Sequence, residues 1–205
     1  MTDKTQRHKE RMQQRKEIVD AAVARADEER GIVIVITGDG KGKTSSGFGT
    51  VLRSLGHGYK VAVVQFIKGT WDCGEKNFLM ESIFRGNTPQ LEYYVMATGF
   101  TWDTQNAEAD KAAAEKVWAE CEHVFRDPEI HLVLLDELTY MLNFKYLDKE
   151  KVLSAIQNRP SNQNVIITGR GAKKYLEDVA DTFSEIKSVK HAFDVGVKAQ
   201  KGIEW

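Results

Sequence analysis

The chain has 205 residues, of which 41% are hydrophobic, and its formal net charge at pH 7 is −1. This length predicts one globular domain with a sizeable core, and the balanced charge predicts neither a nucleic-acid nor a membrane partner. Cys73 and Cys121 form no CxxC pair, which argues against a disulfide framework or a structural zinc site. Because the sequence shows no signal peptide and no apolar run of membrane-spanning length, we expect a cytoplasmic protein.

Residues 1–30 are predicted to form a helical arm that precedes a domain of residues 31–205. The segment 2–30 is very polar and has no Gly or Pro, and an apolar stripe at helical spacing begins only at Met12. Two interpretations remain open. The arm is either a solvated helix with a frayed start or a segment that becomes ordered on a partner or substrate.

The rest of the sequence alternates apolar, β-branched runs with helical segments. The predicted strands are 31–37, 60–66, 91–97, 131–137, 164–169 and a last one within 183–193. The predicted helices are 43–55, 76–85, 107–125, a pair within 138–157 broken near 148–149, and one that begins near 170. This alternation predicts a three-layer α/β fold with a mostly parallel sheet.

The stretch "TGDGKGKTSSG", residues 37–47, follows the first strand and opens a helix. Unpaired backbone N–H groups at a helix N-terminus favour an anion there. The Lys43 ammonium would neutralise phosphate, and the Thr44 hydroxyl is a suitable Mg²⁺ ligand. The glycine spacing is one residue shorter than in the usual phosphate loop, but Thr37 can occupy the position of the first glycine. The predicted nucleotide-binding residues are Gly38, Asp39, Gly40, Lys41, Gly42, Lys43, Thr44 and Ser45.

The run "HLVLLDE" carries Asp136 and Glu137 to the carboxyl end of a strand, where open α/β sheets bind their ligands. A carboxylate at this place binds Mg²⁺ directly or through water, and the sequence leaves open which of the two does so. Thr44, Asp136 and Glu137 are therefore the candidate metal ligands. Together with the loop they predict a nucleoside triphosphate–Mg²⁺ site, but they do not identify a reaction.

Six motifs in a fixed order carry a resemblance to a known family. They are "GDGKGKT", "VVQFIKGTW", "MATGFTWDTQN", "VLLDELTYM", "VIITGRG" and "VKHAFDVGVKAQKGIEW". From about residue 10 to the C-terminus the chain resembles the phosphate-loop ATP:corrinoid adenosyltransferases of cobalamin biosynthesis and salvage, with Asp39 where that family usually has Asn. The resemblance implies a RecA-like P-loop fold and transfer of the 5′-deoxyadenosyl group of ATP to the Co(I) of a reduced corrinoid, with release of triphosphate.

The resemblance also implies roles for residues in the loop and at the acidic strand end. Lys43, Thr44 and Glu137 would stabilise charge on the departing triphosphate, with Mg²⁺ as cofactor or Mn²⁺ as an alternative. Arg170, after the fifth strand, would contact phosphate. Arg53 would face the corrinoid or a second subunit, because the family resemblance implies a homodimer. A reduced flavoprotein is the implied electron donor.

Phe100 and Trp102 are large apolar side chains in a loop rich in Gly and Thr. Taken alone, they could form a hydrophobic plug that seals the loop on the domain. By resemblance they pack below the corrin ring and keep the lower axial ligand off cobalt, which makes Co(II) easier to reduce.

Two other functions remain as alternatives. One is a small-molecule P-loop kinase similar to thymidine kinases, although the paired-cysteine zinc site expected of many such kinases is missing from the sequence. The other is a non-catalytic, ATP-dependent switch that binds a partner through its arm. A kinase would form ADP, whereas a switch would hydrolyse ATP slowly and ignore corrinoids.

Overall fold

The computed structural model describes residues 2–67, 73–84, 90–96 and 106–204. By its internal contacts the chain divides into two compact units, Met1–Arg30 and Gly31–Trp205. In the part of the chain that the structure describes, no helix has both the length and the apolar character needed to cross a membrane.

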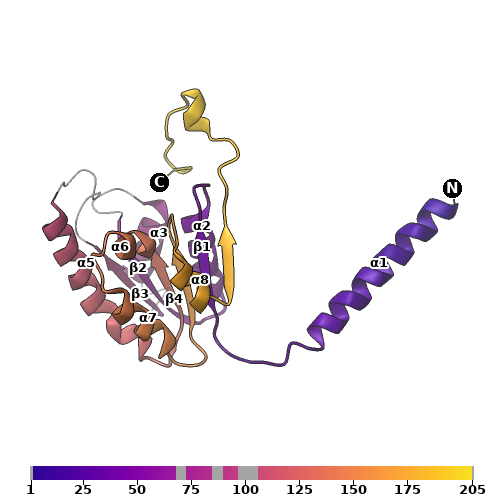
Figure 1. Cartoon of the computed structure of the whole chain (residues 1–205), viewed down its shortest axis with the longest axis horizontal. Helices are drawn as coiled ribbons and strands as arrows, with labels where there is room; N and C mark the ends of the chain where they lie inside the picture. Colours follow the sequence, from indigo (N-terminus) through magenta and orange to yellow (C-terminus); the bar gives the residue numbers. More distant parts are fainter. Residues whose placement is uncertain (1, 68–72, 85–89, 97–105, 205) are drawn as a thin grey trace. The chain divides into compact units, whose positions relative to one another are not determined.

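The first unit contains one long helix, α1 (Thr2–Val23), drawn in indigo in Figure 1. The helix begins at Thr2, and both interpretations of the arm stay predictions. Its residues are mostly strong helix formers, and exposed pairs four positions apart, such as Gln6 and Glu10, hydrogen bond at 3.0 Å. The helix ends before the acidic residues 27–29, which would be unfavourable near the negative end of the helix dipole.

The second unit is built on a six-stranded sheet in which every strand pair is parallel. The strand order is β3-β2-β4-β5-β1-β6. The strands are β1 (Val33–Thr37), β2 (Lys60–Gln65), β3 (Leu91–Val95), β4 (Ile130–Asp136), β5 (Asn164–Thr168) and β6 (Thr182–Glu185). This confirms the predicted α/β class and is consistent with a RecA-like P-loop fold. The last strand, predicted within 183–193, is β6, and its last residue, Glu185, pairs with Thr37 at the end of β1.

Helices cover both faces of this sheet (Figure 1). They are α2 (Lys43–Gly56), α3 (Gly74–Phe84), α5 (Ala107–Cys121), α6 (Leu138–Asn143), α7 (Lys149–Gln157) and α8 (Lys174–Val179), with 3₁₀ turns at Glu122–Phe125 and Ala192–Val195. The predicted pair within 138–157 is present as α6 and α7. Residues 144–148 separate them, and Asp148 caps α7 by accepting a 2.9 Å hydrogen bond from the Lys151 N–H.

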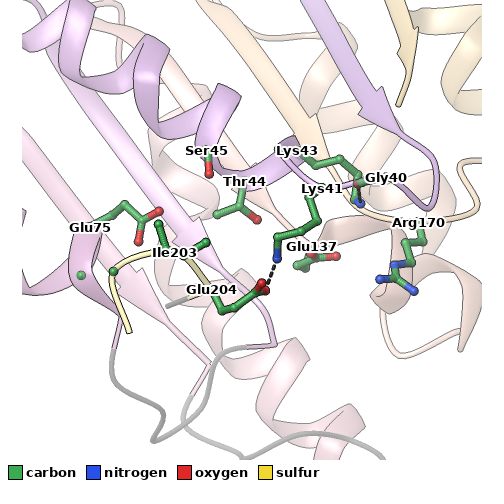
Figure 2. Close-up of a pocket in the computed structure, with 13 residues that line it drawn as sticks. Gly40, Lys41, Lys43, Thr44, Ser45, Glu75, Glu137, Arg170, Ile203 and Glu204 are labelled. Carbon is green, nitrogen blue, oxygen red and sulfur yellow. Dashed lines mark hydrogen bonds and ion pairs between the residues drawn. The ribbon is translucent and has the colours of Figure 1, made fainter. Parts of the chain in front are cut away.

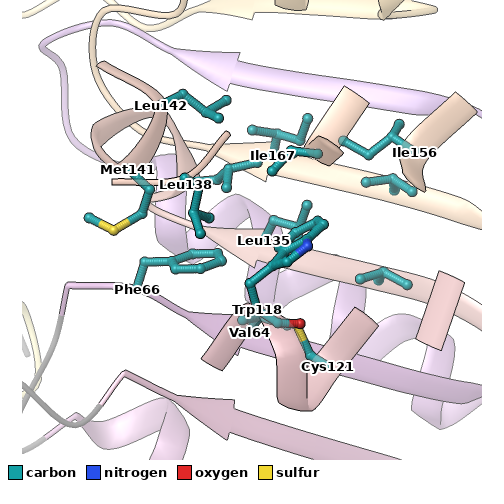
Figure 3. Packing of buried hydrophobic residues seen from close by; sticks show 14 of the residues in the cluster. Val64, Phe66, Trp118, Cys121, Leu135, Leu138, Met141, Leu142, Ile156 and Ile167 are labelled. Carbon is teal, nitrogen blue, oxygen red and sulfur yellow. The ribbon is translucent and has the colours of Figure 1, made fainter. Parts of the chain in front are cut away.

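Two hydrophobic clusters fill the space between the three layers. Along β2, Val61 and Val63 belong to one cluster and Ala62 and Val64 to the other, as expected when successive side chains point to opposite faces. The first cluster includes residues of α2 and α3. The second packs against α5, α6, α7 and α8 around the fully buried Trp118 (Figure 3).

Polar side chains end four neighbouring strands at the same edge of the sheet. Thr37, Gln65, Asp136 and Thr168 are the last residues of β1, β2, β4 and β5, and all four are buried. Because the strands are parallel, their carboxyl ends meet at one edge, which is where open α/β sheets place their ligands. The loop between β1 and α2 begins at this edge.

Candidate functional site

The loop between β1 and α2 depends on glycine for two different reasons. Gly42 has φ 112° at the N-terminus of α2, a left-handed conformation that side chains disfavour. Gly40 donates its N–H to the Ile186 carbonyl at 2.8 Å, and a Cβ at Gly40 would lie 2.7 Å from the Ile186 side chain. The glycines therefore both shape the loop and let the chain after β6 pass close to it.

A cavity of about 540 Å³ lies at this loop (Figure 2). Its volume is within the range of small-molecule sites. Of the sequence-predicted residues, 40–45, Glu137 and Arg170 line it. The structure therefore brings together the phosphate loop, one carboxylate after β4 and one guanidinium after β5.

Lys43 is the buried cation of this cavity. Its Nζ donates a 2.8 Å hydrogen bond to the Gly40 carbonyl, which holds the ammonium against the loop. Burial lowers the pKa of Lys43, the Glu137 carboxylate opposes that change, and the positive charge of Arg170 adds to it. An anion in the cavity would favour the charged ammonium, so the site is suited to bind phosphate.

Glu137 follows β4 with φ 62° and ψ 24°, and it directly precedes α6. Its N–H donates to the Thr168 hydroxyl oxygen at 3.0 Å, and this contact fixes the backbone at the turn. A non-glycine residue in the left-handed region is uncommon and marks a constrained position. The constrained backbone is that of Glu137, whose half-buried side chain lines the cavity.

Asp136 is buried beneath the cavity, whereas its neighbour Glu137 lines it. The Asp136 carboxylate is fully buried and accepts hydrogen bonds from the Thr168 hydroxyl at 2.7 Å and from the Gln65 amide at 3.1 Å. Gln65 in turn accepts a 2.6 Å hydrogen bond from the Tyr93 hydroxyl. Asp136 does not line the cavity, and its contacts instead connect three strands beneath Glu137.

Three other predicted residues lie outside the cavity lining. Gly38 and Asp39 precede the lining part of the loop, and Asp39 is exposed. Arg53 is exposed in the last turn of α2, ten positions after Lys43, which is roughly 15 Å along a helix. The predicted corrinoid contacts Phe100 and Trp102 lie outside the described residues.

Two segments that received no role from the sequence also line the cavity. One is the start of α3, where Glu75 accepts a 3.2 Å hydrogen bond from the thiol of buried Cys73. The other is the C-terminal segment Gly202–Glu204. This second segment lies in "KGIEW", the end of the last of the six motifs that carry the family resemblance. Its residue types alone do not indicate a chemical role.

Among the described residues, no three His, Cys, Asp or Glu side chains gather as a metal-binding group. The Thr44 hydroxyl and the Glu137 carboxylate line the same cavity. Such oxygen donors suit Mg²⁺, which is usually bound by one or two protein ligands together with substrate phosphates. The donor set therefore fits a magnesium ion that arrives with a nucleotide.

Comparison with known proteins gives one consistent result. Residues 29–205 match the family described as ATP:corrinoid adenosyltransferase BtuR/CobO/CobP, and residues 1–23 match the cob(I)alamin adenosyltransferase N-terminal family. The corrinoid adenosyltransferases of Escherichia coli K12 and Salmonella typhimurium LT2 are each 54% identical over 200 residues, which is 98% of either chain. That of Pseudomonas aeruginosa is 49% identical over 203 residues, 99% of this chain and 98% of its own length.

Proposed function

Because the chain belongs to the ATP:corrinoid adenosyltransferase family, we propose that its cavity at residues 40–45 holds the triphosphate of ATP during corrinoid adenosylation. The observation that carries the proposal is the buried Lys43 ammonium at the N-terminus of α2, in one cavity with Glu137 and Arg170. The ATP-binding residues are then Gly40, Lys41, Gly42, Lys43, Thr44, Ser45 and Arg170, with Gly38 and Asp39 shaping the start of the loop.

In this reaction the electron pair of the substrate Co(I) forms a bond to C5′ of ATP. The C5′–oxygen bond breaks, its electron pair leaves with triphosphate, and cobalt becomes an alkylated Co(III). Charge therefore grows on the leaving oxygen, where the loop N–H groups, Lys43 and Arg170 would stabilise it. No protein base is required, because Co(I) is itself a strong nucleophile.

Thr44 and Glu137 are the residues that would hold Mg²⁺, with Mn²⁺ as an alternative. Bound Mg²⁺ would neutralise part of the charge of the triphosphate. Thr168 would fix the Glu137 backbone, and Asp136 would act through Thr168 rather than as a direct ligand. Glu137 is therefore our proposed direct ligand of the pair.

Phe100 and Trp102 are proposed to cover the lower face of the corrin ring. Their replacement by Ala should slow adenosylation from Co(II) with a weak reductant, because the lower ligand can return to cobalt. The same variants should recover much of their rate from corrinoid already reduced to Co(I). Equal losses from both starting states, together with a lower melting temperature, would instead indicate a hydrophobic plug.

Further parts of the proposal concern the surroundings of the reaction. We propose a homodimer, in which residues 1–30 form a separate helical arm that reaches the corrinoid or a second subunit. Arg53 is proposed to face the corrinoid or the second subunit. A reduced flavoprotein would supply the electron that converts Co(II) to Co(I). We also propose a cytoplasmic location, where a reducing environment would keep the thiols of Cys73 and Cys121 reduced.

The test is to incubate the protein with ATP, Mg²⁺ and chemically reduced cob(I)alamin and to identify the products by phosphorus NMR and visible spectroscopy. We expect intact triphosphate in step with a cobalt–carbon bond, and much slower formation of both in Lys43→Ala. ADP formed only with an acceptor, together with the phosphorylated acceptor, would support a kinase. Slow ATP hydrolysis that ignores corrinoid would support a switch. A Lys43→Ala variant that turns over like the wild type would show that the phosphate site is placed wrongly.

A further inference from the structure

The C-terminal segment Gly202–Glu204 contacts the phosphate loop. The Glu204 carboxylate forms an ion pair with the Lys41 ammonium, although the two residues are 163 positions apart (Figure 2). A local turn holds the segment, because the Ile203 and Glu204 N–H groups donate to the Gln200 carbonyl at 3.1 and 2.8 Å. A carboxylate is thus held inside the cavity proposed for triphosphate.

The charges of the cavity lining are balanced with this segment in place. Lys41, Lys43 and Arg170 face three carboxylates, of Glu75, Glu137 and Glu204. Triphosphate would add several negative charges to this balanced set. The Glu204 carboxylate is paired with Lys41, a cation of the loop that an incoming phosphate oxygen would also contact.

We propose that Glu204 is an internal anion of the nucleotide site, which neutralises Lys41 until triphosphate takes its place. The proposal rests on the proposed function, namely that residues 40–45 bind triphosphate. Both anions would bind the same ammonium, and their mutual repulsion disfavours binding of the two together, so they compete for Lys41. When the adenosyl group has been transferred, Glu204 competes with the remaining triphosphate for Lys41 and assists its release.

The first test measures binding of inorganic tripolyphosphate with Mg²⁺ by calorimetry. Both side chains of the pair are partly exposed, at 47% for Lys41 and 23% for Glu204, so the pair is weak. Exposed pairs contribute about 0.2–1 kcal/mol, which corresponds to a Kd roughly 1.4- to fivefold lower in Glu204→Gln. Asp194→Asn is the matched control, because Asp194 is exposed, lies ten positions away and does not line the cavity. Its Kd should equal that of the wild type, and an unchanged or higher Kd in Glu204→Gln overturns the proposal.

A double-mutant cycle with Lys41→Met separates displacement from simple repulsion. If Glu204 acts by holding Lys41, Glu204→Gln should give no gain in affinity once Lys41 is replaced. If the gain is the same in both backgrounds, Glu204 only repels the anion through space, and the competition for Lys41 is refuted.

Hydrogen exchange of the C-terminal peptide from Lys198 onward tests the contact itself. Without ligand, exchange should be faster in Glu204→Gln and in Lys41→Met than in the wild type. Tripolyphosphate should raise wild-type exchange to the level of Glu204→Gln, whereas slower exchange would show that the segment closes over the ligand and would overturn displacement. If neither the wild type nor Lys43→Ala binds tripolyphosphate, the proposed triphosphate site and the displacement both fail. The ligand-free exchange then still decides whether Glu204 holds Lys41.

Discussion

Replacing Thr168 by Val should remove the hydroxyl that connects the buried Asp136 carboxylate to the backbone of Glu137. The Thr168 hydroxyl donates to the Asp136 carboxylate at 2.7 Å and accepts from the Glu137 N–H at 3.0 Å. Valine keeps the shape but removes both hydrogen bonds, one of them to a buried carboxylate. A hydrogen bond to a charged group contributes about 1.5–3 kcal/mol and a neutral one about 1, so we expect unfolding to become easier by about 3 kcal/mol.

Urea unfolding measures this loss, and two variants calibrate it. Thr168→Ser keeps the hydroxyl and should lose about 1 kcal/mol for one buried methyl group. Thr50→Val removes a hydroxyl that bonds only to the Ser46 carbonyl on the surface of α2, and it should change stability by less than about 0.5 kcal/mol. In Thr168→Val the Mg²⁺ requirement should also rise, because Glu137 is no longer fixed. Equal stability of Thr168→Val and Thr168→Ser, or an unchanged Mg²⁺ requirement, would refute the reasoning.

Three further predictions concern the cavity. Lys43→Ala removes one preorganised cation and should lose roughly 3 kcal/mol of transition-state stabilisation, which lowers kcat/KM about 150-fold. Steady-state kinetics with the Co(I) corrinoid as substrate measures this change. Burial lowers the pKa of Lys43, so its charged form costs stability below that pKa and the cost disappears as pH rises. Bound triphosphate favours the charged form of Lys43. Calorimetry should therefore show that the affinity of the wild type for triphosphate falls as the pH rises through the lowered pKa of Lys43. In Lys43→Arg the affinity should not change over the same pH range. Glu137→Gln should raise the Mg²⁺ concentration for half-maximal activity, which a Mg²⁺ titration would detect.

Local patterns were sufficient to predict the strands and helices but not their order in the sheet. The run "GIVIVIT" was predicted as a strand from 31 and forms β1 from Val33. Its first residues are used elsewhere, since Gly31 donates to the Ser161 carbonyl and Ile32 to the Asn164 side chain. Likewise, the sequence of one strand does not predict its neighbours in the sheet. The position of β5 between β1 and β4 depends on contacts between residues that are distant in sequence.

The same distinction applies to the cavity. Residues 40–45 are contiguous, so one motif predicts them together with the helix that presents them. Glu75 and Glu204 come from segments whose local sequence carries no phosphate-binding pattern, and only the folded chain places them beside the loop. Phe100 and Trp102 stay predictions from family resemblance.

Hydrogen-bond direction explains why adjacent carboxylates differ in role. Asp136 accepts on both oxygens, from Thr168 and from Gln65, so an Asn there would oppose one donor with its own N–H₂ group. The Tyr93 hydroxyl donates to the Gln65 carbonyl oxygen, which leaves the Gln65 amide to donate to Asp136. The Thr168 hydroxyl donates its hydrogen to Asp136 and accepts from the Glu137 N–H with a lone pair of its oxygen. This last hydrogen bond helps to fix the backbone from which the Glu137 side chain enters the cavity.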